Sequence, residues 1–150
     1  MFPNLESIKI SGADVLPLIE GGKGVAITSG LSSGAWAEAG GVGTISGVNA
    51  DSYDSNGKVI PQIYSGKSRK DRHQELIEYA ISGGITQAKI AHDTRKGNGR
   101  IHVNILWEMG GAEKVLTGIL EKAGNIIHGV TCGACLLYTS PSPRDQRGSR

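Results

Sequence analysis

The residues best suited to ligand chemistry lie in one short stretch, Glu20–Val25, where glycines surround a single lysine. Glycine lacks a Cβ, so the backbone can adopt positive φ there and a flat group can lie directly against it. Glycine turns that follow strands also occur where nothing binds, and this stretch alone leaves both interpretations open. The residues expected to contact a ligand here are Gly21, Gly22, Lys23 and Gly24.

A second candidate is Asn104, which lies in the alternating pattern of residues 100–107. Successive side chains of a strand point to opposite faces, so His102 and Asn104 share the face opposite to the aliphatic side chains. In a closed barrel one face lines the interior, and active sites lie at the carboxyl ends of the strands. We therefore expect Asn104 to point into a site, with a hydrogen-bonded structural amide as the alternative. The aliphatic residues of the pattern are Ile101, Val103 and Ile105.

The cysteines and histidines give a weaker signal. Cys132 and Cys135 form a Cys-Gly-Ala-Cys run, which is typical of a redox couple or of half a metal site. Two cysteines and the nearby His128 still leave tetrahedral zinc one ligand short, so no metal is expected. The two histidines of the central region, His73 and His92, are expected at the surface, and His128 is expected to pack within a strand.

The elements that must position these residues alternate between strand and helix. Apolar runs framed by glycines predict strands at 15–19, 40–47, 100–107 and 126–132, with a short lead-in strand at 8–10. Helices are expected at about 31–39, 69–81, 85–96 and 112–123, with Gly83 and Gly84 separating the second from the third. Residues 48–68 are expected to form a long irregular loop. Four βα repeats without an antiparallel return imply a parallel sheet with right-handed crossovers.

The first predicted helix has a recognisable start and an apolar stripe. Either Thr28 or Ser29 can cap it, because both side chains carry the oxygen that accepts from the first free backbone N–H groups. Residues of the stripe recur at helical spacing, as on a helix that packs against a core. They are Leu31, Ala35, Trp36 and Ala39.

Composition limits the classes of partner. A chain of 150 residues can form one domain with a real core, and its net charge of +2 gives no electrostatic argument for a nucleic-acid or membrane-surface partner. No apolar run approaches the roughly 20 residues that a membrane helix needs, and the first residues lack a signal-peptide pattern. We therefore expect a cytoplasmic protein that acts on a small molecule.

Four segments, Glu20–Val25, Ala39–Ile45, His102–Asn104 and Gly129–Ala134, are characteristic in combination. Together they resemble the nitronate monooxygenase family of flavoproteins, formerly called 2-nitropropane dioxygenases, over about residues 8 to 134. That family is a TIM (β/α)8 barrel with FMN at its carboxyl-terminal mouth, and it oxidises alkyl nitronates with O2. Its relatives include flavin-type enoyl-ACP reductases and quinone reductases.

The resemblance implies that residues 1–134 form the N-terminal half of an FMN-binding TIM barrel, an α/β fold with about four parallel strands. It implies that the turn Gly21–Gly24 lies against the isoalloxazine ring and that Asn104 hydrogen-bonds the edge of the ring. Lys23 departs from the family, which usually has methionine there, and a lysine directed at the flavin would favour the reduced anionic form. The family's catalytic histidine would lie beyond Ala134, so the catalytic residue stays unknown.

The last residues differ in character from the rest. Past Tyr138 the chain has no apolar side chain and is rich in proline and arginine, which is typical of disorder and resembles translated vector sequence. We therefore expect residues 135–150 to be a non-native tail on an incomplete fragment. The open strand edges of such a fragment favour homo-oligomers or aggregation. The isolated chain is expected to bind FMN poorly or not at all and to be inactive.

Two other functions stay open from the sequence. One is an NAD(P)H-dependent flavin reductase that acts on an enoyl thioester or a quinone. The other is not an enzyme but a phosphate-ligand binding or interaction module. Bleaching of the flavin of the full-length protein by NADH without nitronate would favour the first, and a full-length product with no flavin spectrum would favour the second. The most useful single observation is the genomic reading frame downstream of Ala134.

Overall fold

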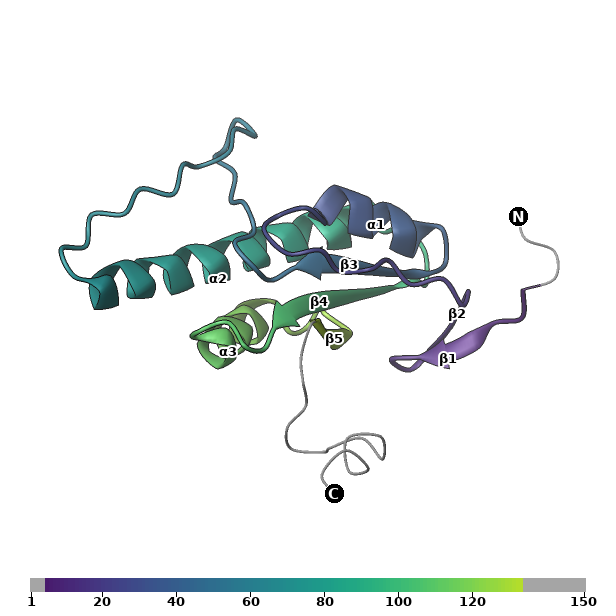
Figure 1. Ribbon diagram of the computed structural model, residues 1–150. Helices are drawn as coiled ribbons and strands as arrows, with labels where there is room; N and C mark the ends of the chain where they lie inside the picture. The colour runs from purple at the N-terminus through teal and green to yellow at the C-terminus, as the bar shows by residue number, and fades with distance from the viewer. Residues whose placement is uncertain (1–4, 134–150) are drawn as a thin grey trace, which may run out of the picture.

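A parallel sheet of three strands forms the centre of the molecule, in the order β3 (Val42–Ser46), β4 (Arg100–Leu106), β5 (Gly129–Gly133) (Figure 1). The computed structural model describes residues 5–133. Both strand pairs are parallel and in register, with Ser46 opposite Asn104 and Asn104 opposite Thr131. The carboxyl ends of the three strands therefore lie at one edge of the sheet.

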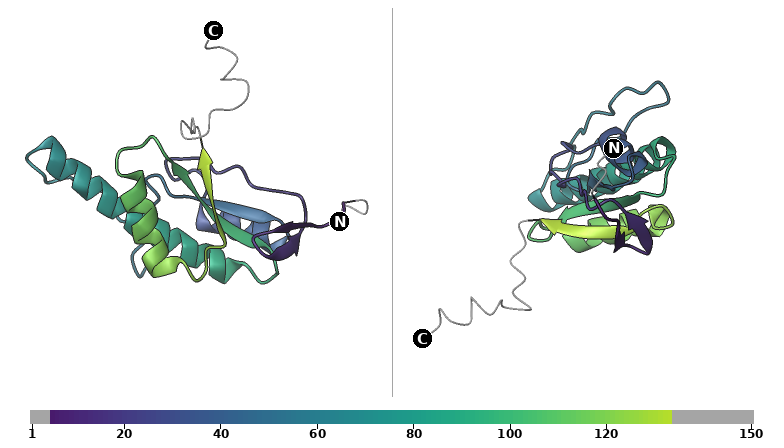
Figure 2. Two further views of the ribbon diagram at one scale, coloured as in Figure 1. Left: turned by 90° about the horizontal axis from the view of Figure 1, so that it is seen from below. Right: turned by 90° about the vertical axis from the view of Figure 1, so that its right-hand side faces the viewer.

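Three helices pack on one face of this sheet: α1 (Gly30–Glu38), α2 (Arg69–Thr94) and α3 (Ala112–Ala123) (Figure 2). Helix α1 contacts β3, α2 contacts both β3 and β4, and α3 packs against α2 and β4. The core lies between these helices and the aliphatic side chains of the sheet. Its fully buried branched members include Ile45, Ile101, Val103, Ile105, Val115 and Ile119.

The chain begins with a separate antiparallel hairpin, β1 (Ile8–Ile10) and β2 (Ala13–Val15). Ser11 and Gly12 connect the strands, with φ values of 48° and 78°. Positive φ at both central residues matches the right-handed twist of a two-residue hairpin. The lead-in strand expected at residues 8–10 is therefore confirmed, but its partner is the next segment of chain and not the central sheet.

The expectation of half a TIM barrel with four parallel strands is wrong. The central sheet has three parallel strands, and the first predicted strand, at 15–19, contributes its beginning to the hairpin. Pro17 lacks an N–H, and the N–H of Leu18 bonds the carbonyl of Leu16 in a tight turn at 2.7 Å. The remainder of the run keeps a single parallel bridge, between Ile19 and Val42.

Helix α1 begins as expected but presents a different face to the core. Ser29 is its N-cap, and the Ser29 side chain accepts from the N–H of Ser32. The predicted apolar stripe is wrong, because Leu31 is 66% exposed and Trp36 is 40% exposed. Small residues face inward because α1 approaches α2 closely: a Cβ on Gly30 or Gly34 would collide with α2. The buried residues of α1 are Gly30, Ser33, Gly34 and Ala37.

The predicted helix break at Gly83 and Gly84 is also wrong, because α2 is continuous over 26 residues. These glycines serve close packing. A Cβ on Gly83 would collide with the carbonyl oxygen of Ala50, and one on Gly84 would collide with Ile119. In a helix that tertiary contacts stabilise, the propensity cost of two glycines, about 1 kcal/mol each, does not interrupt the hydrogen bonds.

The remaining predictions of elements hold with small shifts of boundary. Helix α3 coincides with the predicted 112–123, and β4 and β3 fall within their predicted ranges. The loop before α2 is irregular apart from one bridge between Tyr53 and Val59, and it extends outward beside the first half of α2 (Figure 1). Strand β5 begins at Gly129, so His128 precedes the strand instead of packing within it.

Within residues 5–133, no helix combines the length and the apolar character that crossing a membrane requires. The predicted tail, residues 135–150, and Cys135 lie outside the described residues.

Candidate functional site

The face of the sheet opposite the helices is polar, and its side chains are buried. Strand register aligns Thr44 with His102, and Ser46 with Asn104 and Thr131. Thr44 and Ser46 are fully buried, and Asn104 and His102 are 6% and 8% exposed. Buried polar side chains on one face of a sheet need hydrogen-bond partners, which makes this face the first place to look for a ligand.

The glycine turn lies directly over this polar face. A Cβ on Gly22 would collide with the Cβ of Asn104 and would come within 2.9 Å of the Thr44 methyl group. Gly21 has open space in place of a side chain, and Gly24 lies beside Val48. The structure thus brings the predicted turn and Asn104 together, with Gly22 in contact and Gly21 facing outward.

Hydrogen bonds fix the turn to the carboxyl end of β3. The N–H of Lys23 donates to the Thr28 hydroxyl at 3.2 Å, and that hydroxyl donates to the Lys23 carbonyl at 3.3 Å. The N–H of Ala26 donates to the Val48 carbonyl at 3.2 Å. Thr28 therefore closes the turn, whereas Ser29 caps the helix.

Two residues within the turn have left-handed backbone. Val25 has φ 56° and Ala26 has φ 60°. A β-branched residue in this region is an outlier, and such positions cost about 1–3 kcal/mol each, so they persist only where the surrounding structure enforces them. The closed loop between Lys23 and Thr28 provides that enforcement. Strained backbone of this kind clusters at ligand sites, which adds weight to the turn as a site.

Asn104 is oriented by its neighbour in β5. The Thr131 hydroxyl donates to Asn104 Oδ1 at 3.2 Å. Fixing the oxygen in this way directs the amide nitrogen, Nδ2, which carries two donors. Asn104 Nδ2 can therefore donate to a ligand at the carboxyl edge of the sheet while Oδ1 stays bonded to Thr131.

Glu20 is also part of this site, although it is not among the residues predicted to contact a ligand. Its carboxylate Oε2 accepts from the N–H of Thr44 at 2.8 Å, and the residue is 8% exposed. The backbone of the chain leaves β3 at Gly21, so the Glu20 side chain replaces the next bond of the ladder. No local sequence pattern identifies this role, because it depends on where the N–H of Thr44 lies in space.

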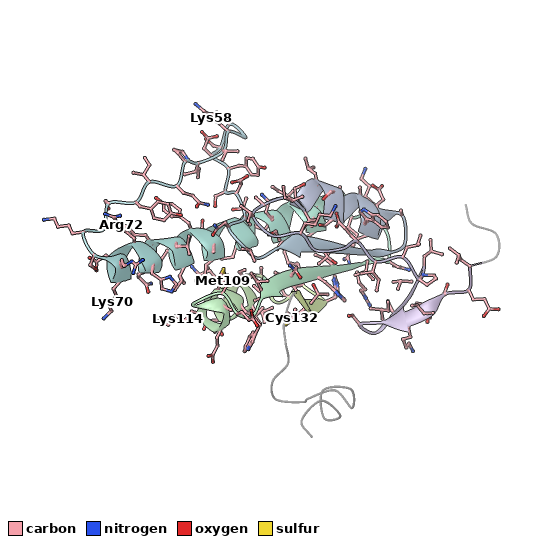
Figure 3. The ribbon with its side chains drawn as sticks, viewed as in Figure 1. Lys58, Lys70, Arg72, Met109, Lys114 and Cys132 are labelled. Atoms are coloured by element: carbon pink, nitrogen blue, oxygen red, sulfur yellow. The ribbon has the colours of Figure 1, made fainter. Side chains whose placement is uncertain are left out.

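The histidines expected at the surface, His73 and His92, are exposed, which confirms that prediction. Cys132 is exposed on β5 (Figure 3). Among residues 5–133, no three side chains of the metal-binding types gather closely enough to hold an ion.

A separate pocket lies between α1 and the residues that precede the glycine turn. It is an apolar pocket of about 450 Å³ lined by Leu18, Ala35, Trp36, Ala39 and Gly41. Ligand sites combine apolar walls with a few convergent polar groups, and the side chains that line this pocket are all apolar. The polar face under the glycine turn is therefore the stronger candidate.

The residues present fit a flat heterocycle such as the FMN ring system. Gly21 leaves one side of the turn open to a planar group, and the Asn104 amide carries donors for the edge of such a group. A ring cannot insert between Gly22 and Asn104, because the two are already in contact. A ring bound at this turn would therefore lie beside Gly21, at the carboxyl edge of the sheet.

No protein-family model, no curated protein and no solved structure matches this chain.

Proposed function

We propose that this chain carries part of the flavin site of an FMN-dependent oxidoreductase that oxidises alkyl nitronates with O2. The observation that supports it is the contact between Gly22 and Asn104 at the carboxyl edge of a parallel sheet. Two of the four segments that resemble the nitronate monooxygenases meet there, and ligands of open α/β sheets bind at that edge. The proposal takes a small molecule as the partner and the cytoplasm as the compartment.

Each residue of the site has a distinct part in the proposal. Gly21 offers bare backbone to the face of the ring, and Asn104 donates from Nδ2 to a ring oxygen or nitrogen. Lys23 is exposed at the same turn, and its charge favours an anion nearby. Bound FMN supplies the chemistry, since it accepts the electrons of the nitronate and passes them to oxygen.

Flavin binding tests the first half of the proposal. FMN is titrated to millimolar concentration into the 150-residue chain while the amide signals of the protein are followed by NMR. We expect weak, saturable shifts at Gly21, Gly22 and Gly24, and a dissociation constant roughly two- to tenfold higher for Asn104→Ala, since one neutral hydrogen bond contributes about 0.5–1.5 kcal/mol.

Asn125→Ala is the matched control, because Asn125 is an exposed asparagine after α3, and it should bind like the parent chain. Circular dichroism verifies that both variants are folded. Shifts that are absent from the glycine turn, or that are equal in the parent chain and in folded Asn104→Ala, would contradict the proposal.

Oxygen uptake tests the second half. The product of the genomic reading frame that encodes this chain is supplied with FMN and an alkyl nitronate. Oxygen consumption that needs both is the expected result. Bleaching of the flavin by NADH without any nitronate would instead support the reductase alternative and would overturn the nitronate substrate.

A further inference from the structure

Four basic side chains gather at the opposite, amino-terminal end of β4 and β5. Arg95 follows α2, Arg100 and His102 belong to β4, and His128 immediately precedes β5. The ring of His102 lies against Gly129, where a Cβ would come within 2.9 Å of the ring carbon Cε1. The cluster thus joins the end of a helix to the starts of two neighbouring strands.

Hydrogen bonds hold the two histidines in place. His128 Nδ1 accepts from the N–H of Ile101 at 3.1 Å, and His128 Nε2 lies 3.1 Å from Arg95 Nη1. His102 Nε2 lies 2.9 Å from the Ser11 hydroxyl of the hairpin turn. Both rings are therefore oriented by the protein before any ligand arrives.

Several donors of this cluster have no partner. Arg95 Nε, Arg100 Nε and His102 Nδ1 are buried without a hydrogen bond, and they make up half of the six such atoms in the described part of the chain. An arginine Nε always carries a hydrogen. His102 carries one on Nδ1 when the Ser11 hydroxyl donates to Nε2. Unpartnered buried donors are costly, so three in one place point to a missing acceptor.

The positive charge of the cluster also favours an anionic ligand. The pKa of His128 is lowered to about 4. Burial is the largest cause, and the positive charges of Arg95 and Arg100 contribute as well. Every charged side chain that acts on this ring is basic. Arg95 and Arg100 are partly exposed as whole residues although their Nε atoms are buried, so the cluster lies at the protein surface.

We propose that Arg95, Arg100 and His102, the side chains with unpartnered donors, form a binding site for a tetrahedral oxyanion, the phosphate group of a small phosphorylated ligand or free phosphate. Arginine presents Nε and Nη in a planar fork that matches two phosphate oxygens. The neighbouring His128 ring and the hairpin turn border the site. The site is separate from the flavin site, because four residues of strand, about 13 Å, separate Arg100 from Asn104.

The test follows the His128 ring by NMR while pH is varied, first in chloride and then in sulfate at equal ionic strength. Sulfate keeps its charge over the pH range used, so only the protein titrates. A bound dianion favours the charged imidazole, and we expect sulfate to raise the pKa of His128 from about 4 by at least about one unit, which equals a tenfold preference for the protonated form.

Variants then locate the anion. Arg100→Gln should weaken sulfate binding at least about tenfold. The control Arg72→Gln removes an arginine at the far end of α2, whose Nε donates to the Gly66 carbonyl, and it should leave binding unchanged (Figure 3). Equal weakening by both variants, or an unchanged pKa of His128 in the parent chain, would overturn the proposal. The parent-chain measurement needs no variant, so it stands even if Arg100→Gln does not fold.

Two further probes separate the sources of the anion. Inorganic phosphate and ribose 5-phosphate are each allowed to compete with sulfate in the parent chain. Tighter binding of the sugar phosphate assigns the site to a phosphorylated ligand, and tighter binding of inorganic phosphate assigns it to the free anion. Failure of both to displace sulfate would contradict the proposal. None of the probes contains flavin, so the outcome is independent of the proposed oxidoreductase function.

Discussion

The two faces of the central sheet differ sharply in what they bury. Toward the helices, Ile45, Ile101, Val103 and Ile105 are fully buried in an apolar core. The opposite face buries Thr44, Ser46, His102 and Asn104 under a glycine turn and a hairpin. Apolar burial stabilises the fold in proportion to area, whereas buried polar groups add little net stability. The first face therefore maintains the fold, and the second is the face at which we propose that ligands bind.

The largest expected effect is on the helix-covered face. Ile101→Ala should lower the free energy of unfolding by about 2–5 kcal/mol, because a fully buried branched side chain leaves a cavity. Ile8→Ala is the matched control: Ile8 is 44% exposed, and its replacement should change stability by less than about 0.5 kcal/mol. Urea denaturation measures both, and similar losses would remove the distinction between core and surface.

On the polar face the sharpest comparison is between adjacent glycines. Gly22→Ala should destabilise by about 1–3 kcal/mol, because its Cβ would meet Asn104 and Thr44. Gly21→Ala places its Cβ in open space and should be nearly neutral. Thermal unfolding of the two variants gives the comparison. Equal stability would mean that the turn does not pack on Asn104.

Acid should weaken the amino-terminal end of the sheet. The folded pKa of His128 is about 4, below its ordinary value of 6.5, so the folded state binds fewer protons than the unfolded state between these values. The contribution of His128 is complete above pH 6.5 and is lost as pH falls toward 4. With allowance for solvent screening, the loss is about 1–2 kcal/mol.

The measurement for this prediction is urea unfolding between pH 7 and pH 4 for the parent chain and for His128→Gln. The variant should show a shallower decline, since glutamine does not titrate. Parallel curves for the two proteins would exclude His128 as a source of the acid sensitivity.

The smallest effect is expected at Thr44. Its hydroxyl is buried without a partner, so Thr44→Val should change stability by less than about 0.5 kcal/mol in either direction. Thr28→Val removes a hydroxyl that both donates and accepts within the turn and should cost about 0.5–1.5 kcal/mol. A larger loss at Thr44 than at Thr28 would show that the Thr44 hydroxyl has a partner in solution.

The sequence predicted elements where the pattern was long and local. The apolar spacing of α3 and the alternation of β4 each specify an element without reference to the rest of the chain. The predicted helix break at Gly83 and Gly84 was wrong because glycine occurs both at helix breaks and where two elements approach closely. Only the positions of Ala50 and Ile119 distinguish the two cases. The predicted burial of Leu31 and Trp36 was wrong because periodicity does not show which face of a helix its neighbour will cover.

The site shows the same limit. Gly22 and Asn104 could be selected by residue type, but their contact depends on a parallel register that no local pattern encodes. Glu20 was not predicted, because its carboxylate replaces a backbone hydrogen bond, and only the three-dimensional structure shows this role. The basic cluster was not predicted for a similar reason, since its members come from the end of α2, from β4 and from the residue before β5.

The central claim is that a flat ring rests against Gly21 of the glycine turn, at the carboxyl edge of the sheet next to Asn104. The most direct measurement is a set of intermolecular nuclear Overhauser effects between FMN ring protons and the protein. The claim predicts contacts to the α-protons of Gly21 and to the side-chain amide of Asn104. Contacts to Trp36 and Leu18, in the apolar pocket beside α1, with none at the turn, would contradict it.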